Sequence, residues 1–171
     1  IGDAQPVILD ASTNTLANCI QTSTIGAASV YNRFTGLRLT GATADGVDGG
    51  TASNRATFEG CKIDTNGTTA GNGIQWNDYL TLVGCELTGN GTRSIECDND
   101  LIMLGCKVHG EQPTVIACQT IKAISNLFYN NGNGTYIAYS AEASLFVGNA
   151  FDGEGGASSQ AISSSGSSTI P

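Results

Sequence analysis

A short alternation of apolar and polar residues recurs six times along this chain. Each copy has an alternating apolar run, a small residue, a second apolar pair and a turn rich in Gly and Asn. The copies are Phe34–Leu39, Phe58–Ile63, Leu82–Leu87, Met103–Val108, Ala123–Phe128 and Phe146–Phe151. The small residues lie at positions 36, 60, 84, 105, 125 and 148, so successive copies are 24, 24, 21, 20 and 23 residues apart. A period of this length with strand-type alternation predicts a stacked β-solenoid.

A second strand is expected before each main run. Residues i and i+2 of a strand share one face, so two further columns of this strand are expected to face the core. These columns are Ile74, Ile95, Ile116, Ile137 and Ile162, followed two positions later by Trp76, Cys97, Cys118 and Tyr139. The main run is expected to add the inward columns Leu80, Leu101 and Ile121; Phe58, Leu82, Met103 and Phe146; and Ile63, Leu87, Val108, Phe128 and Phe151.

The small residue of each copy is expected to form a bend where a Cβ would crowd the corner. The residue after it forms one inward column, which consists of Cys61, Cys85, Cys106, Asn126 and Asn149. Stacked inward Asn side chains hydrogen-bond along a ladder, which satisfies their amides.

The stretches Ile124–Phe128 and Val147–Phe151 resemble the I-x-N-x-F rungs of right-handed parallel β-helix proteins, a group that includes pectate lyases and bacteriophage tailspikes. The resemblance covers residues 30–165, is closest in kind to the phage β-helices, and brings no catalytic motif. It implies an all-β fold: a single-stranded right-handed parallel β-helix of about six to seven rungs. Residues 1–29 are expected to form an N-terminal cap or irregular first rung, and 166–171 a C-terminal tail or incomplete strand.

Charge excludes two classes of partner. The 171 residues carry a formal charge of −8, and only 13% of them are charged. Nucleic-acid binding needs clusters of Lys and Arg, and anionic lipid attracts the same residues. No apolar run approaches the roughly 18 residues of a membrane helix. We therefore expect neither a nucleic-acid nor a membrane partner.

The six cysteines are expected to be buried free thiols rather than a disulfide framework, because most of them recur at equivalent repeat positions. They are Cys19, Cys61, Cys85, Cys97, Cys106 and Cys118. No CxxC or Cys/His spacing suggests zinc, so neither a metal nor a cofactor is expected, and His109 is expected on a turn. Reduced thiols suit assembly in a bacterial cytoplasm.

An aliphatic column is expected on the outside of the solenoid. It consists of Val83, Leu104, Ile124 and Val147, and it is joined by Ile102 and Leu145 two positions before the second and last of these. A monomer should not expose such a stripe, so it predicts a subunit interface about a threefold axis. The alternative is that the register slips at the bend and these side chains point inward.

Two further patterns have simpler interpretations. Arg38, Lys62, Glu86 and Lys107 are expected to form a solvated cross-strand ladder of charges. The triplets Asn66-Gly67-Thr68, Asn90-Gly91-Thr92 and Asn133-Gly134-Thr135 match the N-glycosylation pattern, but Asn-Gly at one repeat position favours turn chemistry.

Catalysis on this fold would need paired carboxylates in a groove. The best cluster is Asp78, Glu96, Asp98 and Asp100, with Tyr79 beside it and Arg93 as the nearest candidate base. Asp and Asn also bond their own backbone, so the alternative for residues 98–100 is a capped turn.

The function expected from the sequence is a structural bacteriophage virion protein: a capsid decoration or cement protein, or a tailspike or fibre module. The expected partners are two further copies in a homotrimer, other virion proteins and a host surface polysaccharide contacted through Tyr79. The expected location is the virion, with a secreted protein as the alternative. The alternative function is a polysaccharide lyase or glycoside hydrolase of the pectin-lyase-like fold.

Overall fold

The computed structural model describes residues 7–12, 16–22, 30–50, 54–67, 71–110, 115–131, 135–139, 144–152 and 160–164. Their regular structure is β-strand. The strands are β1 (Val7–Asp10), β2 (Ile20–Gln21), β3 (Val30–Thr35), β4 (Leu37–Thr40), β5 (Val47–Asp48), β6 (Asn54–Glu59), β7 (Lys62–Asp64), β8 (Asn72–Trp76), β9 (Tyr79–Val83), β10 (Glu86–Thr88), β11 (Arg93–Leu104), β12 (Lys107–His109), β13 (Ile116–Ile124), β14 (Leu127–Tyr129), β15 (Thr135–Tyr139), β16 (Leu145–Val147), β17 (Ala150–Asp152) and β18 (Gln160–Ser164).

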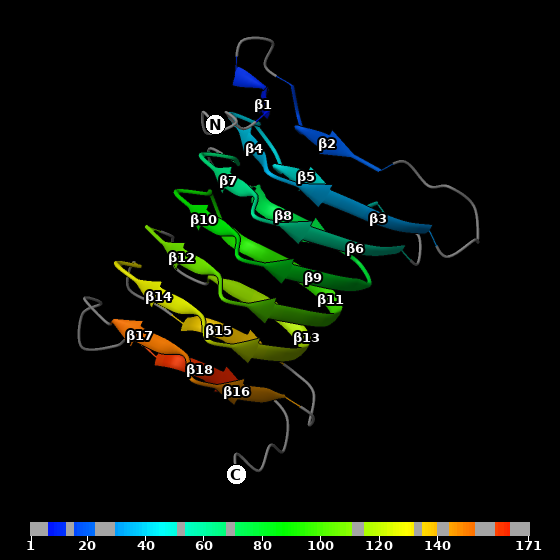
Figure 1. The fold of residues 1–171 in the computed structure, drawn as a ribbon. Helices are drawn as coiled ribbons and strands as arrows, with labels where there is room; N and C mark the ends of the chain where they lie inside the picture. The colour runs from blue at the N-terminus through cyan, green and yellow to red at the C-terminus, as the bar shows by residue number, and fades with distance from the viewer. Residues whose placement is uncertain are drawn as a thin grey trace, which may run out of the picture.

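Two parallel sheets run the length of the stack (Figure 1). The seven-stranded sheet has the order β1-β4-β7-β10-β12-β14-β17. The eleven-stranded sheet has the path β18-β15-β13-β11-β8-β5-β2, with β3, β6, β9 and β16 paired beside it. Each strand pairs with its counterpart in the next repeat, so the chain forms an all-β parallel solenoid, as the sequence predicts. The described parts of residues 1–29 supply β1 and β2 to these sheets, and residues 166–171 lie outside the described part.

The inward columns predicted from the alternation form the core. Ile74, Ile95 and Ile116 are paired in register and fully buried. The same holds for Leu39, Ile63, Leu87, Val108 and Phe128 and for Phe58, Leu82 and Met103. Phe146 and Phe151, at the C-terminal end of these two columns, are only partly buried. Each fully buried aliphatic or aromatic side chain contributes roughly 1.5 to 3 kcal/mol, and stacking makes the core continuous along the axis. The side chain of Tyr139 lies outside the described residues.

The bend that follows each main strand has a conformational cause. Gly36, Gly60, Gly84, Gly105 and Gly148 have φ between 59° and 64°, and Ser125 at the equivalent position has φ 55°. This is the left-handed region, which favours residues without a Cβ. The expected crowding of a Cβ is wrong: a Cβ built on four of these glycines (36, 60, 84 and 105) meets nothing within 4 Å. The corner therefore selects glycine for its backbone freedom alone.

A second left-handed corner follows five residues after the first. It is formed by Gly41, Thr65, Gly89, Gly110 and Asn130, with φ between 50° and 78°. Between the two corners lies one short strand of the seven-stranded sheet. The number of residues between the two corners is the same in these repeats. The differences in repeat length therefore lie outside this short strand, and the strand keeps its register with its neighbours.

Asn126 and Asn149 form the expected inward amide ladder. The Nδ2 of Asn126 donates to the Oδ1 of Asn149 at 2.9 Å and to the carbonyl of Met103 at 3.1 Å. The thiol of Cys85 donates to the carbonyl of Phe58 at 3.3 Å, which is the same repeat position as Met103. The thiols of this column therefore act as ladder donors as well as small apolar groups.

A second amide ladder lies inside the second corner. Asn66 and Asn90 are buried, and the Nδ2 of Asn66 donates to the Oδ1 of Asn90 at 3.2 Å. The glycosylation triplets at these positions therefore have an internal, structural role, as turn chemistry predicts. The third triplet was placed at the same repeat position, which is wrong: the buried equivalent is Asn131, and Asn133 lies outside the described residues.

The first corner predicts a stability effect at Gly84. Gly84→Ala should lower the free energy of unfolding by about 1 kcal/mol, because Ala resists positive φ while its methyl group has free space. Gly84→Asn, which tolerates this region better, should lose less. Urea denaturation followed by circular dichroism checks both variants, and an Ala variant as stable as the parent would contradict the explanation.

The amide ladder predicts a larger effect at Asn126. Asn126→Ala removes the acceptor of the Cys106 N–H, held at 2.8 Å, and the donor to the Met103 carbonyl. Leaving these buried groups unpaired should cost about 2 to 4 kcal/mol of unfolding free energy. Asn126→Cys should recover part of this loss, since a thiol donates at the same position in other rungs. Denaturation of both variants tests the ladder, and equal losses would contradict the role given to the thiols.

Candidate functional site

The outer face of β3, β6, β9, β11, β13 and β16 carries a column of outward aliphatic side chains. Val83 pairs with Leu104, Leu104 with Ile124, and Ile124 with Val147. Their sequence neighbours toward the core, such as Leu82 and Met103, are fully buried. Alternation then directs the column outward, so the register does not slip at the bend. We call Val83, Ile102, Leu104, Ile124, Leu145 and Val147 the apolar zone.

The apolar zone is more open toward its C-terminal end. Leu145 and Val147 are 43% and 49% exposed, whereas Val83, Leu104 and Ile124 are half-buried by their neighbours on the sheet. One cation, Lys122, stands beside the zone and is exposed. Its register partners are Ile102 and Leu145. The zone is thus an aliphatic surface with a single charge on it.

On β3, β6 and the first part of β9, the outward side chains of the same sheet face are polar or aromatic. Tyr31 is 62% exposed and Tyr79 42%, and Arg55 lies between them in register. The Arg55 guanidinium lies 4.8 Å from the centroid of the Tyr79 ring. Arg33 forms an ion pair with Glu59. One sheet face therefore has two parts of different chemistry.

The outer face of the seven-stranded sheet is charged and internally paired. Lys62 donates to Glu86 at 2.8 Å, and this hydrogen bond holds the pKa of the Glu86 carboxyl below its ordinary value. Arg38 instead pairs with Asp64, across the strand direction, through two hydrogen bonds of 2.6 and 3.1 Å. The expected ladder of charges is present in part, with Asp64 as a member that was not foreseen.

His109 lies at the end of β12 rather than on a turn, so that expectation is wrong. Its ring stacks on Tyr129 with a centroid separation of 4.5 Å. Its Nε2 lies 3.4 Å from Glu86 Oε1, and its Nδ1 lies 3.2 Å from Thr88 Oγ1. The imidazole is therefore held by neighbours of its own sheet.

The four candidate carboxylates do not form one cluster. Glu96 and Asp98 line one surface hollow of about 230 Å³. Glu96 is held by Arg93 at 2.7 Å and by Asn72 at 3.0 Å. Asp78 and Asp100 do not line this hollow. The hollow thus offers only one carboxylate, Asp98, outside the ion-pair network.

The other two carboxylates have partners of their own. Asp78 is nearly buried and accepts a hydrogen bond from Asn99 at 3.1 Å. Asp100 accepts one from the hydroxyl of Thr120. Residues 98–100 lie inside β11, where the register with β13 shifts between Cys97 and Asp100. The capped turn expected there is therefore an irregularity within a strand.

Comparison with known proteins identifies the fold family. A family model described as the right-handed β-helix region matches residues 5–170. The chain belongs to the right-handed β-helix family. A search of curated proteins found no match, and neither did a search of solved structures. The family agrees with the parallel stack and with the fold that the resemblance implies.

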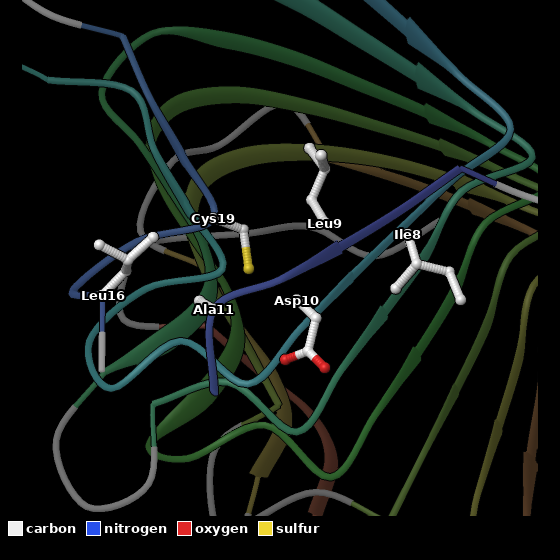
Figure 2. A pocket seen from close by; sticks show the side chains of 6 residues that line it. All are labelled: Ile8, Leu9, Asp10, Ala11, Leu16 and Cys19. Atoms are coloured by element: carbon white, nitrogen blue, oxygen red, sulfur yellow. The ribbon is translucent and has the colours of Figure 1, made fainter. Parts of the chain in front are cut away.

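The N-terminal end of the β-helix has a hollow of about 290 Å³ (Figure 2). Leu9 lies on one side of β1, and Ile8 and Asp10 lie on the other. Leu9 pairs with Leu39, so the hollow continues a core column toward the end of the stack. Leu16 and Cys19 complete the apolar lining.

The thiols of this β-helix are free in all six cases, as predicted. Burial raises the pKa of Cys97 and of Cys118 to about 12. Among the described residues, no group of three or more His, Cys, Asp or Glu side chains is placed to hold a metal ion. None of the helical segments in the described part of the chain has the length and apolar character of a membrane span.

Sequence reasoning found the apolar zone but missed Tyr31 and Arg55. Both residues lie three positions before the apolar run of their repeat. No outward aliphatic residues mark the described outer face of these two repeats. The available signal was register: counting back four residues from Thr35, Glu59 and Val83 gives Tyr31, Arg55 and Tyr79.

Burial predicts that these cysteine thiols react slowly with thiol reagents in the folded protein. At pH 8 the folded protein should leave its five buried thiols unreacted with Ellman's reagent for as long as it stays folded, and six should react after unfolding. Because burial raises the pKa of Cys97 and of Cys118 above the ordinary value of 9.0, these two protonated thiols favour the folded state below about pH 9, whereas the hydrogen bond with Cys85 lowers the pKa of Cys106. This contribution is lost as the pH rises toward 12. Rapid reaction of all six thiols in the folded protein would contradict their placement.

Proposed function

We propose that this chain is a structural module of a bacteriophage virion protein and assembles as a homotrimer through the apolar zone. The module is a capsid decoration or cement protein, or part of a tailspike or fibre. The observation that carries the proposal is the zone itself: six aliphatic side chains on four neighbouring strands that face outward, with Lys122 between Ile102 and Leu145.

Association through the apolar zone would remove its aliphatic side chains from water. Burying apolar surface is favourable by roughly 25 cal/mol for each Å², so an association that covers several aliphatic side chains gains several kcal/mol. The zone is built on strands whose other face is the rigid core, so little ordering is needed on binding. A second copy is the partner that supplies the same aliphatic surface, and a threefold arrangement closes the contact without exposing a further zone.

Two other features support a virion role. The six free thiols suit assembly in a bacterial cytoplasm before incorporation into the virion. The stacked parallel strands also suit a virion, because each inner rung is held by the rungs on either side and the stack resists unfolding. Other virion proteins and a host surface polysaccharide, contacted at Tyr79, are the further partners of this proposal.

The alternative of a polysaccharide lyase or glycoside hydrolase has no observation in its favour here. Its four carboxylates are divided between different neighbours, and Glu96 is held in an ion pair with Arg93. The alternative stays a prediction from the sequence.

If the apolar zone is the interface, a lysine placed inside it should disrupt the trimer, and a lysine placed outside it should not. Leu104→Lys should convert the trimer to monomers, because each copy would add a second cation next to Lys122 and would bury it at the centre of the aliphatic column. Leu127→Lys is the matched control: Leu127 is 37% exposed on the outer face of the seven-stranded sheet, outside the zone. Sedimentation velocity with circular dichroism separates loss of assembly from loss of fold. A folded Leu104→Lys variant that keeps the mass of the parent would contradict the proposed interface.

A further inference from the structure

Three residues at the N-terminal end of the same sheet face form a column of their own. Tyr31, Arg55 and Tyr79 are paired in register on β3, β6 and β9. All three are exposed. We call them the tyrosine–arginine column. It is separate from the apolar zone, although β9 contributes to both.

The column has donor capacity that the fold does not use. Among the described residues, Arg33 pairs with Glu59, whereas Arg55 makes no ion pair. The Arg55 guanidinium instead lies over the Tyr79 ring at 4.8 Å. Stacking on an aromatic face leaves the N–H groups at the edge of a guanidinium free to donate. Arg55 is therefore positioned by Tyr79 but still has donors for a ligand.

Hydroxyl groups border the column on the side toward the bend. The hydroxyl of Tyr31 lies 3.0 Å from the Oγ1 of Thr57, so the ring is held in place at its polar end. Thr57 pairs with Thr81 on the next strand. Rings fixed in this way on a β-sheet present a flat, preorganised surface, which lowers the entropic cost of binding.

We infer that the tyrosine–arginine column binds an extended glycan chain that runs along the solenoid axis. This inference rests on the proposed function and extends its contact at Tyr79 to a three-residue site. Tyr31 and Tyr79 are two strands apart, about 9.6 Å from the usual strand spacing, a span comparable to two sugar rings. The apolar C–H face of one pyranose ring packs on Tyr31 and that of another on the face of Tyr79 that Arg55 does not cover, and Arg55 donates to a hydroxyl or carboxylate of the sugar.

Other occupants fit this column less well. Nucleic acid is opposed by the formal charge of −8. A second copy of the chain would bring its aliphatic side chains against Arg33, Arg55 and Glu59, which prefer water. The sugar chain satisfies both the rings and the hydrogen-bonding groups.

Affinity electrophoresis of the whole chain in native gels tests the inference. The probes are hydroxyethyl cellulose, which is neutral, carboxymethyl cellulose, which has the same backbone with carboxylates, and xylan, with dextran as a chain of different shape. We expect at least one extended probe to retard the protein. Tyr31→Ala and Tyr79→Ala should weaken binding roughly fivefold to tenfold. Tyr31→Phe, which keeps the ring but loses the contact with Thr57, should weaken binding less than Tyr31→Ala does.

The controls separate the possible outcomes. Tyr129→Ala removes a tyrosine from the seven-stranded sheet and should leave retardation unchanged. Stronger retardation by carboxymethyl cellulose that Arg55→Ala abolishes would identify an acidic sugar, and equal retardation by both celluloses a neutral one. No retardation by any probe, or equal retardation of the parent and Tyr31→Ala, would overturn the inference.

The result is independent of the assembly. Tyr31→Ala should keep the sedimentation mass of the parent, whereas Leu104→Lys should lose the trimer but keep a monomer whose retardation depends on Tyr31. Failure of the glycan site with an intact trimer, and failure of the trimer with an intact glycan site, therefore give different results.

Discussion

The structure depends on a backbone constraint: two left-handed corners, five residues apart, in five successive repeats of the described chain. At the first corner the φ values of the glycines lie within a few degrees of one another, and Ser125 adopts the same conformation. A corner of constant geometry returns the chain to the same place above the previous rung, so equivalent residues stack. The core columns, the amide ladders and the outer face all follow from this repetition. A residue that resisted positive φ would misplace everything after it in the rung.

The outer face shows how alternation creates function on such a scaffold. Every second residue of a strand is committed to the core, so the remaining positions are free to vary without altering the stack. In the N-terminal rungs these positions are tyrosine, arginine, threonine and Glu59, and in the C-terminal rungs they are mostly aliphatic, with Lys122 among them. The two parts of the face share a scaffold yet suit different partners, which is why assembly and glycan binding are proposed for different residues.

Much of this arrangement could be predicted from the sequence. The alternation of apolar and polar residues within each strand and the spacing of about twenty residues between repeats are both visible in the order of the amino acids. The columns through Ile95, Leu101 and Val108 are examples. The cause of the bend could not be predicted in the same way: a recurring glycine does not reveal whether space or φ selects it. The partners of the candidate carboxylates could not be predicted either: Asp78 accepts a hydrogen bond from Asn99, Asp100 accepts one from Thr120, and the register between β11 and β13 shifts beside Asp100. Spacing along the chain does not show such a shift.

The most direct test of the account is the native mass of the unmodified chain, measured by multi-angle light scattering over a range of concentrations. The account predicts a species of three times the chain mass of 17.5 kDa that persists on dilution. A single species of 17.5 kDa at every concentration would contradict it, because the apolar zone would then be exposed to water with no partner.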